Sequence, residues 1–222
     1  MTDKILVINP NSTEEVTRAM DAALDPLRNG IEIESVTNPD GPPGIESQGD
    51  VDFVAGHVRS MVTARDNDAS AFVVACFSDP GLQAAREVTG KPVFGISECG
   101  MLTAMGLGQG VGVIAILSKS IPRHTRYFRG LGLDTRIAGE RPLELGVVEL
   151  SDEGKTYGRM VEVATALRDK DGADVIVMGC AGMARYRARL EDEISLPVVD
   201  PTQAATAMAI SAVRLGFKGK GG

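Results

Sequence analysis

The chain alternates short runs of β-branched and other apolar residues with longer segments in which apolar residues recur every three or four positions. Such alternation is typical of βαβ units, which build a parallel sheet with helices on its faces. The short runs predict eight strands, at Lys4–Ile8, Ile31–Val36, Ala71–Ala75, Val93–Ile96, Val111–Ala115, Thr135–Ala138, Val175–Met178 and Val198–Val199. The longer segments predict eight helices, at Thr13–Arg28, Asp50–Asp66, Pro80–Val88, Glu98–Gly106, Ile121–Gly130, Glu153–Lys170, Met183–Leu190 and Thr202–Leu215.

Three pairs of residues recur along the chain at nearly the same separation, which indicates an internal repeat. The separations are 104 residues for Cys76 and Cys180, 105 for Pro92 and Pro197, and 106 for Ser12 and Ser118. Solenoid repeats are far shorter, so a period of this length indicates a duplicated lobe. We therefore expect an α/β fold of two pseudo-symmetric lobes, each a four-stranded parallel sheet flanked by helices. Residues 1–95 and 200–222 are expected to form the N-terminal lobe, and residues 96–199 the C-terminal lobe.

The repeated positions also indicate where a ligand binds. The paired cysteines and the paired serines fall just after the carboxyl ends of predicted strands, and open parallel sheets bind their ligands at that edge. Two lobes that face each other along such edges enclose a cleft. We expect a small-molecule active site in this interlobe cleft.

Composition narrows the class of protein and of partner. Of the 222 residues, 43% are hydrophobic and 24% are charged, as in ordinary globular proteins. The net charge is −7 and no segment concentrates Lys and Arg, so we expect no nucleic-acid partner. The apolar run Ile5–Ile8 is too short for a signal peptide or a membrane span, which predicts a cytoplasmic protein without a membrane partner. The apolar segment Ala204–Ala212 fits either a core helix or the contact surface of a homo-oligomer, and we expect a homo-oligomer.

Three cysteines, an odd number in a chain without a secretion signal, indicate reduced thiols rather than a disulfide framework. Cys76 and Cys180 occupy matching positions of the repeat, so each lobe is expected to present one thiol to the cleft. Two thiols on opposite sides of one molecule can move a proton from one face of a carbon atom to the other. A lone buried cysteine usually packs as a small apolar residue. We expect that role for Cys99, which has no partner at the repeat distance.

The residues after each thiol predict a helix that begins near the sulfur. The small residues Ala181 and Gly182 let a helix N-terminus approach Cys180, and free backbone N–H groups at such an end favour the thiolate. After Cys76, Ser78 or Asp79 is expected to cap the following helix.

Other motifs give no support for a metal or a cofactor. The glycines of Gly106–Gly112 precede a predicted strand, whereas a dinucleotide-binding loop follows one. The two histidines, His57 and His124, are not spaced as metal ligands, and we expect them at the surface or at an interface. The sequence therefore predicts neither a metal nor a cofactor.

Four segments, in order along the chain, resemble one enzyme family. They are VINPNST at 7–13, GPPGIES at 41–47, ACFSDPGL at 75–82 and MGCAGMA at 178–184. On these motifs the chain resembles the aspartate/glutamate racemase superfamily, and within it the hydantoin (allantoin) racemase group. The resemblance implies cofactor-independent racemisation at ring C5 of 5-substituted hydantoins or allantoin, with Cys76 and Cys180 as the two catalytic acid/base residues.

The implied mechanism needs a pocket and donors for an enolate oxygen. One cysteine takes the proton as a thiolate while the other donates a proton from the opposite face. Donors that follow the strands stabilise the enolate formed between the two steps, and the proline-stiffened loop at 41–46 supplies Ile45 as an apolar wall. The expected substrate-binding residues are Asn11, Ser12, Ile45, Phe77, Ser78, Ser118, Ala181 and Gly182.

One segment departs from the hydantoin racemase pattern. Ile116–His124 is more apolar and more basic than the Thr-rich sequence typical of that group, which allows a charged or bulkier substrate. The alternatives among enzymes are an aspartate or glutamate racemase, a cis-trans isomerase, and an enzyme like arylmalonate decarboxylase, although the last implies glycine at the position of Cys76. Outside enzymes, the alternative is a two-lobed protein that binds a small molecule without turnover.

Overall fold

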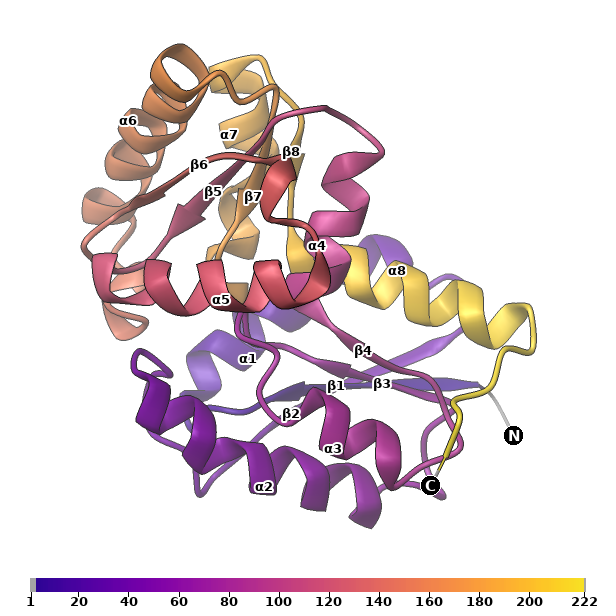
Figure 1. The fold of residues 1–222 in the computed structure, drawn as a ribbon. Coiled ribbons are helices and arrows are strands. Elements are labelled where there is room, and N and C mark those ends of the chain that lie inside the picture. The colour runs from indigo at the N-terminus through magenta and orange to yellow at the C-terminus, as the bar shows by residue number, and fades with distance from the viewer. Residues whose placement is uncertain (1–2, 222) are drawn as a thin grey trace.

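The computed structural model describes residues 3–221, which form two four-stranded parallel sheets (Figure 1). The first has the strand order β2-β1-β3-β4, formed by Glu32–Thr37, Lys4–Asn9, Ala71–Val74 and Val93–Gly95. The second has the order β6-β5-β7-β8, formed by Ile137–Pro142, Val111–Ala115, Val175–Met178 and Val198–Val199. The two sheets share one topology, so the two-lobed α/β fold predicted from the repeat is confirmed.

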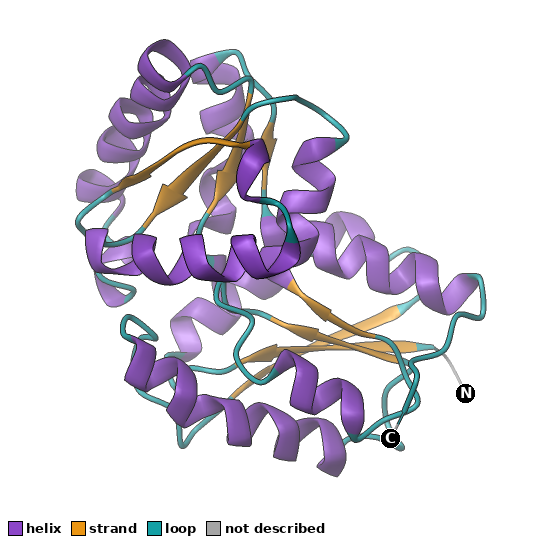
Figure 2. Cartoon of the chain, in the orientation of Figure 1, coloured by secondary structure: helices purple, strands orange, loops and turns teal. Residues whose placement is uncertain are grey.

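Helices cover both faces of each sheet (Figure 2). On the first sheet α2 and α3 pack on one face, and α1 and α8 on the other. On the second sheet α6 and α7 pack on one face, and α4 and α5 on the other. The helices are α1 (Glu14–Ala23), α2 (Gln48–Ala64), α3 (Leu82–Glu87), α4 (Ile96–Met105), α5 (Ile121–Leu131), α6 (Glu153–Asp171), α7 (Arg187–Ile194) and α8 (Pro201–Arg214).

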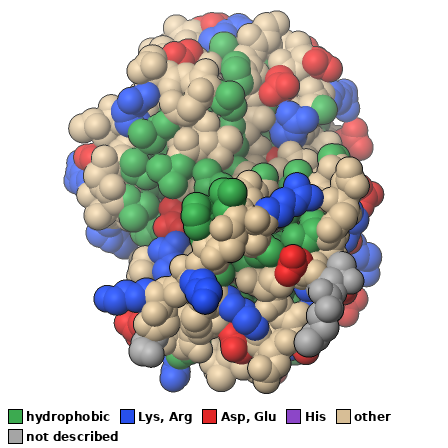
Figure 3. Space-filling model, turned by 90° about the vertical axis from the view of Figure 1, so that its right-hand side faces the viewer, with side chains coloured by type: hydrophobic (Ala, Val, Ile, Leu, Met, Phe, Trp, Pro, Cys, Tyr) green, Lys and Arg blue, Asp and Glu red, His purple; other side chains and the backbone are tan. Residues whose placement is uncertain are grey.

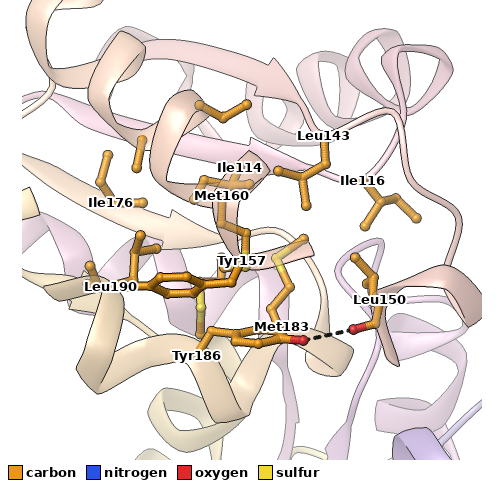
Figure 4. Packing of buried hydrophobic residues seen from close by; sticks show 14 of the residues in the cluster. Ile114, Ile116, Leu143, Leu150, Tyr157, Met160, Ile176, Met183, Tyr186 and Leu190 are labelled. Carbon is orange, nitrogen blue, oxygen red and sulfur yellow. Dashed lines mark hydrogen bonds between the residues drawn. The ribbon is translucent and has the colours of Figure 1, made fainter. Parts of the chain in front are cut away.

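The central strands are apolar on both faces because both faces are covered. Every residue of β3, β5 and β7 is buried, and alternate residues of a strand point to opposite sides. Ile114 and Ile176 therefore pack with Met160 beneath α6 (Figure 4), whereas Val113 and Val177 pack on the side of α4 and α5. Each such side chain contributes roughly 1.5–3 kcal/mol on burial.

One strand and two helices differ from the sequence prediction by more than two residues at one end or both. The strand expected at 135–138 begins at Ile137 and continues to Pro142, because it is an edge strand whose residues are all only partly buried and show no apolar alternation. The helix expected from Met183 is a 3-10 helix at Ala181–Tyr186 followed by α7. The first helix ends at Ala23, where a short 3-10 helix containing Pro26 takes over.

The last helix joins the end of the chain to the first lobe. Although α8 follows β8 of the second sheet, it packs with α1, β1 and β3. Six of the nine residues from Ala204 to Ala212 are buried, so the apolar character of this segment serves mainly the core. Figure 3 shows hydrophobic side chains exposed on one face of the molecule, the face that lies to the right in Figure 1. No helix among residues 3–221 combines the length and the apolar composition needed to cross a membrane.

Candidate active site

Cys76 and Cys180 occupy equivalent positions in the two lobes. Cys76 lies two residues after the end of β3, and Cys180 lies two residues after the end of β7. Both side chains are partly buried and line one cavity between the lobes. The fold thus brings together two thiols that are 104 residues apart in the sequence. The other lining residues are Asn11, Val16, Ile45, Ala75, Phe77, Ser78, Ile116, Ser120, Arg123, His124, Val147, Gly179 and Ala181.

The cavity is small in this structure. Its volume is about 30 Å³, which is room for about two water molecules. A five-membered ring with a substituent needs more room than this.

Each sulfur accepts a hydrogen bond from the backbone two residues further along the chain. The N–H of Gly182 donates to Cys180 Sγ at 3.4 Å, and the N–H of Ser78 donates to Cys76 Sγ. Burial raises the pKa of Cys76 to about 12 and that of Cys180 to about 11, and these N–H groups offset only part of the effect. The other thiol is one of the groups that raise the pKa of Cys76. Near neutral pH both groups are therefore mainly thiols, and forming a thiolate at either one is energetically costly.

Five of the eight substrate-binding residues expected from the sequence line this cavity together with the two thiols. They are Asn11, Ile45, Phe77, Ser78 and Ala181.

Three of the expected residues do not line the cavity. Ser118 is exposed, and the serine that reaches the cavity from this loop is Ser120. The backbone N–H of Ser12 donates a hydrogen bond to the carbonyl oxygen of Pro42 at 3.0 Å, and Ser12 is not among the residues that line the cavity. Gly182 lines a neighbouring hollow with Val147 and Leu150, and reaches the site only through its N–H to Cys180.

Asn11 is held in place by its own turn. Its Oδ1 accepts hydrogen bonds from Asn9 Nδ2 at 3.0 Å and from the backbone N–H of Thr13 at 2.9 Å. Because the oxygen is occupied, the side-chain NH2 group is the part of Asn11 that remains to serve a ligand in the cavity.

A polar wall built by α5 was not predicted from the sequence. Ser120, Arg123 and His124 lie at the start of this helix and line the cavity. Arg123 Nε donates to Ser78 Oγ at 3.0 Å, which links the two lobes beside Cys76. His124 was expected at the surface or at an interface, and of these two positions the surface one is wrong. Its side chain is 3% exposed, hydrogen-bonds to Glu140 and packs edge-on against Phe77.

Asp79 caps α4, not α3, which is the next helix after it along the chain. Its carboxylate accepts hydrogen bonds from the N–H groups of Ser97 and Glu98 at the start of α4, both at 2.9 Å, and from the Tyr127 hydroxyl at 2.8 Å. The helix after Cys76 begins only at Leu82, after Gly81 in the left-handed conformation with φ +68°. The capping role expected for Asp79 thus holds for a different helix, and it fixes the turn after Cys76 to α4 and α5.

Comparison with known proteins identifies the family. Residues 5–209 match the family model described as Asp/Glu/hydantoin racemase. The chain belongs to this family. The racemase resemblance of the sequence motifs is thereby confirmed.

Individual members of the family are similar over nearly their full length. The hydantoin racemase of Paenarthrobacter aurescens is 34% identical over 219 residues, which cover 97% of this chain and 93% of that protein. The allantoin racemase structure from Klebsiella pneumoniae superposes with a TM-score of 0.94 at 31% identity, covering 98% of this chain and 90% of that one. The allantoin racemase structure from Pseudomonas fluorescens gives 0.93 at 30% identity, covering 98% and 93%.

The cavity offers thiols and hydrogen-bond donors as its chemical groups. Among residues 3–221, no three His, Cys, Asp or Glu side chains gather in the manner of a metal site. The polar side chains that line the cavity of this Asp/Glu/hydantoin racemase family member are the two thiols, the Asn11 amide, the Ser78 hydroxyl group and the polar wall of α5. Such a set suits proton transfer at a carbon atom next to a carbonyl group.

Proposed function

We propose that this protein is a cofactor-independent racemase of hydantoin-type substrates, namely 5-substituted hydantoins or allantoin, and that Cys76 and Cys180 are its two acid/base residues. The observation that carries the proposal is the position of the two thiols, each two residues beyond the end of an equivalent strand and both in one cavity. The relatives named hydantoin racemase and allantoin racemase support the substrate class.

In the proposed reaction one cysteine is a thiolate and the other a thiol. The thiolate takes the proton from C5, and the electron pair of the broken C–H bond moves onto the C4 carbonyl oxygen as an enolate. The thiol on the opposite face then donates its proton to C5, which inverts the configuration. The two sulfurs have exchanged protonation states at the end, so the same site processes the opposite enantiomer in reverse. The N–H groups of Ser78 and Gly182 stabilise whichever sulfur is charged.

The enolate oxygen needs donors that are in place before the proton moves. We assign this role to the side-chain amide of Asn11 and to the backbone N–H groups of Phe77 and Ala181, the residues next to the two cysteines in the cavity wall. Loss of one such donor typically costs about 3 kcal/mol of barrier. Removal of a cysteine removes a proton carrier and stops inversion in both directions.

Single enantiomers in deuterated water test the proposal. Purified protein is incubated with one enantiomer of several 5-substituted hydantoins, of allantoin, of aspartate and of glutamate, and loss of optical rotation is followed together with deuterium uptake. The wild type is expected to racemise a hydantoin or allantoin and to introduce deuterium at C5. Samples without protein give the spontaneous rate, which is subtracted.

Variants of the two thiols assign the proton carriers. Cys76→Ser and Cys180→Ser are each expected to lose racemisation, while retaining deuterium exchange without inversion for one enantiomer, because the remaining base can remove and return a proton on its own face. Cys99→Ser is the matched control, since Cys99 is buried away from the cavity. Full racemisation by either active-site variant contradicts the two-base assignment.

The alternatives give different results in the same experiment. An aspartate or glutamate racemase exchanges those amino acids and not the hydantoins. A binding protein without turnover binds a ligand tightly, exchanges no proton and tolerates loss of both thiols.

A further inference from the structure

A buried cation lies in the wall of the proposed active site. Arg123, in the first turn of α5, is only 8% exposed and lines the cavity that contains Cys76. Its Nε donates to Ser78 Oγ at 3.0 Å, and its Nη1 lies 3.5 Å from the carbonyl oxygen of Glu46. Both acceptors are neutral, and they engage only part of a guanidinium group with five N–H donors.

The charge of Arg123 has no carboxylate partner within residues 3–221. Asp50 and Glu140 act on it through space, but Asp50 accepts the N–H groups of Glu46 and Ser47 at the start of α2, and Glu140 is bonded to His124. None of the described residues that line the cavity is Asp or Glu. A buried arginine without a counter-ion is unfavourable, so the position favours a ligand that brings a negative charge.

A second polar group beside Arg123 also lacks a partner. Ser120 is fully buried and lines the same cavity, and its Oγ makes no hydrogen bond to any other part of the described chain. Because Ser120 lies three residues before Arg123 at the start of the helix, the two side chains share one face. An unpaired buried hydroxyl group is costly, and a ligand oxygen next to Arg123 satisfies it.

Apart from His124, which is hydrogen-bonded to Glu140, the rest of the cavity is apolar or is assigned to the proton transfer. Val16, Ile45, Ile116 and Val147 form an apolar wall, and the thiols and their neighbouring N–H groups serve C5 and the enolate. The corner made by Ser120 and Arg123 is therefore available to a substituent of the substrate.

We infer that Ser120 and Arg123 form a subsite for a carboxylate on the substrate, which makes this protein selective for hydantoins with an acidic side chain at C5, such as the hydantoins of aspartate and glutamate. The inference rests on the proposed racemase function and names its substrate class. Arg123 supplies a two-pronged contact that a carboxylate matches and a neutral amide does not. Ser120 supplies a further O–H donor.

Two substrates of nearly the same shape test whether the charge of the C5 substituent matters. 5-(Carboxymethyl)hydantoin carries a carboxylate where 5-(carbamoylmethyl)hydantoin carries a neutral amide of nearly the same size. The wild type is expected to racemise the acid with a kcat/KM about tenfold to a hundredfold higher than the amide, the range that corresponds to a buried hydrogen bond with a charged group. Equal kcat/KM values for the two overturn the inference.

Variants locate the selectivity. Arg123→Gln is expected to abolish the preference by lowering kcat/KM for the acid about tenfold or more beyond any change for the amide, and Ser120→Ala to reduce the preference partially. Arg126→Gln on the same helix is the control, because Arg126 is exposed and bonded to Gln48 outside this cavity. If Arg123→Gln does not fold, Arg123→Lys replaces it in the test. This variant keeps the positive charge but loses the planar guanidinium group that makes two parallel hydrogen bonds, so it is expected to reduce the preference for the acid.

The test also separates the subsite from a role of Arg123 toward the thiols. Arg123 lies near enough to Cys76 to favour its thiolate, and a residue with only that role lowers kcat/KM equally for both substrates and shifts the pH profile. That outcome overturns the inference.

Binding separates the inference from the proposed function. Calorimetric titration of the acid into wild type and Arg123→Gln needs no turnover, so loss of acid binding in the variant supports the subsite even if no hydantoin is racemised. If racemisation is present and binding of the acid is unchanged in Arg123→Gln, the subsite is wrong and the racemase function stands.

Discussion

The carboxyl group of Asp79 lies directly against Gly95, so that a Cβ atom at position 95 would lie 2.3 Å from Cγ of Asp79. This close approach lets the carboxylate reach the N–H groups of Ser97 and Glu98 at the start of α4. Position 95 must therefore be glycine, because any side chain there would push Asp79 away from α4 and free the turn after Cys76.

We expect Gly95→Ala to lower the free energy of unfolding by about 3 kcal/mol, because the methyl group displaces Asp79 and the start of α4 loses its cap. Chemical denaturation measures the change. Gly56→Ala is the control: Gly56 lies inside α2 with no atom within 4 Å of its added Cβ, so this variant should gain up to about 1 kcal/mol. Equal stabilities of Gly95→Ala and wild type contradict the contact.

The titration of Asp79 should make stability depend on pH. Burial raises the pKa of Asp79 to about 7, and the hydrogen bonds from Ser97, Glu98 and Tyr127 only partly offset this. Between about pH 4 and pH 7 the folded protein holds a proton that the unfolded chain has released, so the contribution of this group to the free energy of unfolding falls as the pH rises. We expect wild type to lose about 2 kcal/mol relative to Asp79→Asn between pH 5 and pH 8. Denaturation of both proteins at the two pH values measures this, and a constant difference argues against it.

The buried contact between His124 and Glu140 should be costly to break on one side. The two side chains are 3% and 6% exposed, so His124→Phe leaves the carboxylate of Glu140 in the interior without its partner. We expect a loss of about 3 kcal/mol in the free energy of unfolding, and partial recovery in the double variant with Glu140→Leu. Arg129→Ala, which removes an exposed ion pair with Asp134, should cost at most about 1 kcal/mol. A single variant as stable as wild type refutes the expectation.

Racemisation should accelerate as the pH rises. Burial raises the pKa of Cys180 to about 11 and that of Cys76 to about 12, so the form with one thiolate and one thiol is a minor species near neutral pH. Its population increases about tenfold per pH unit. We expect kcat/KM to rise with a slope of about one between pH 7 and pH 9 for both enantiomers, after subtraction of the spontaneous rate. A plateau that begins below pH 8 shows instead that the reacting sulfur ionises far more easily.

The sequence predicted the fold because the signals for it are local and repeated. Each buried strand is a short apolar run, and the paired positions at Cys76 and Cys180 revealed the duplication without any structure. The edge strand β6 was misplaced because its residues are all only partly buried and carry no alternating pattern.

The candidate site was predicted only in part because its polar wall looks like the surface of a helix. In sequence, Arg123 and His124 stand among other charged residues, and a cation is normally solvated. A usable signal existed in the spacing: Ser120, His124 and Phe128 recur every four residues on one face, and Phe128 is fully buried. Ser118 was expected in the cavity because it lies at the repeat separation from Ser12. A short 3-10 helix at Ser118–Ser120 follows β5, and Ser120 at its end is the serine that lines the cavity.

The asymmetric placement of Ser120 and Arg123 in the cavity has a kinetic consequence. Mirror-image substrates have equal free energies in water, so a racemase has the same kcat/KM in both directions. Ser120 and Arg123 come from one lobe only, so no rotation maps the pocket onto itself and the two mirror images rest in it differently. The two enantiomers should therefore have different kcat values and different KM values. The two differences should cancel, so that kcat/KM is the same for both.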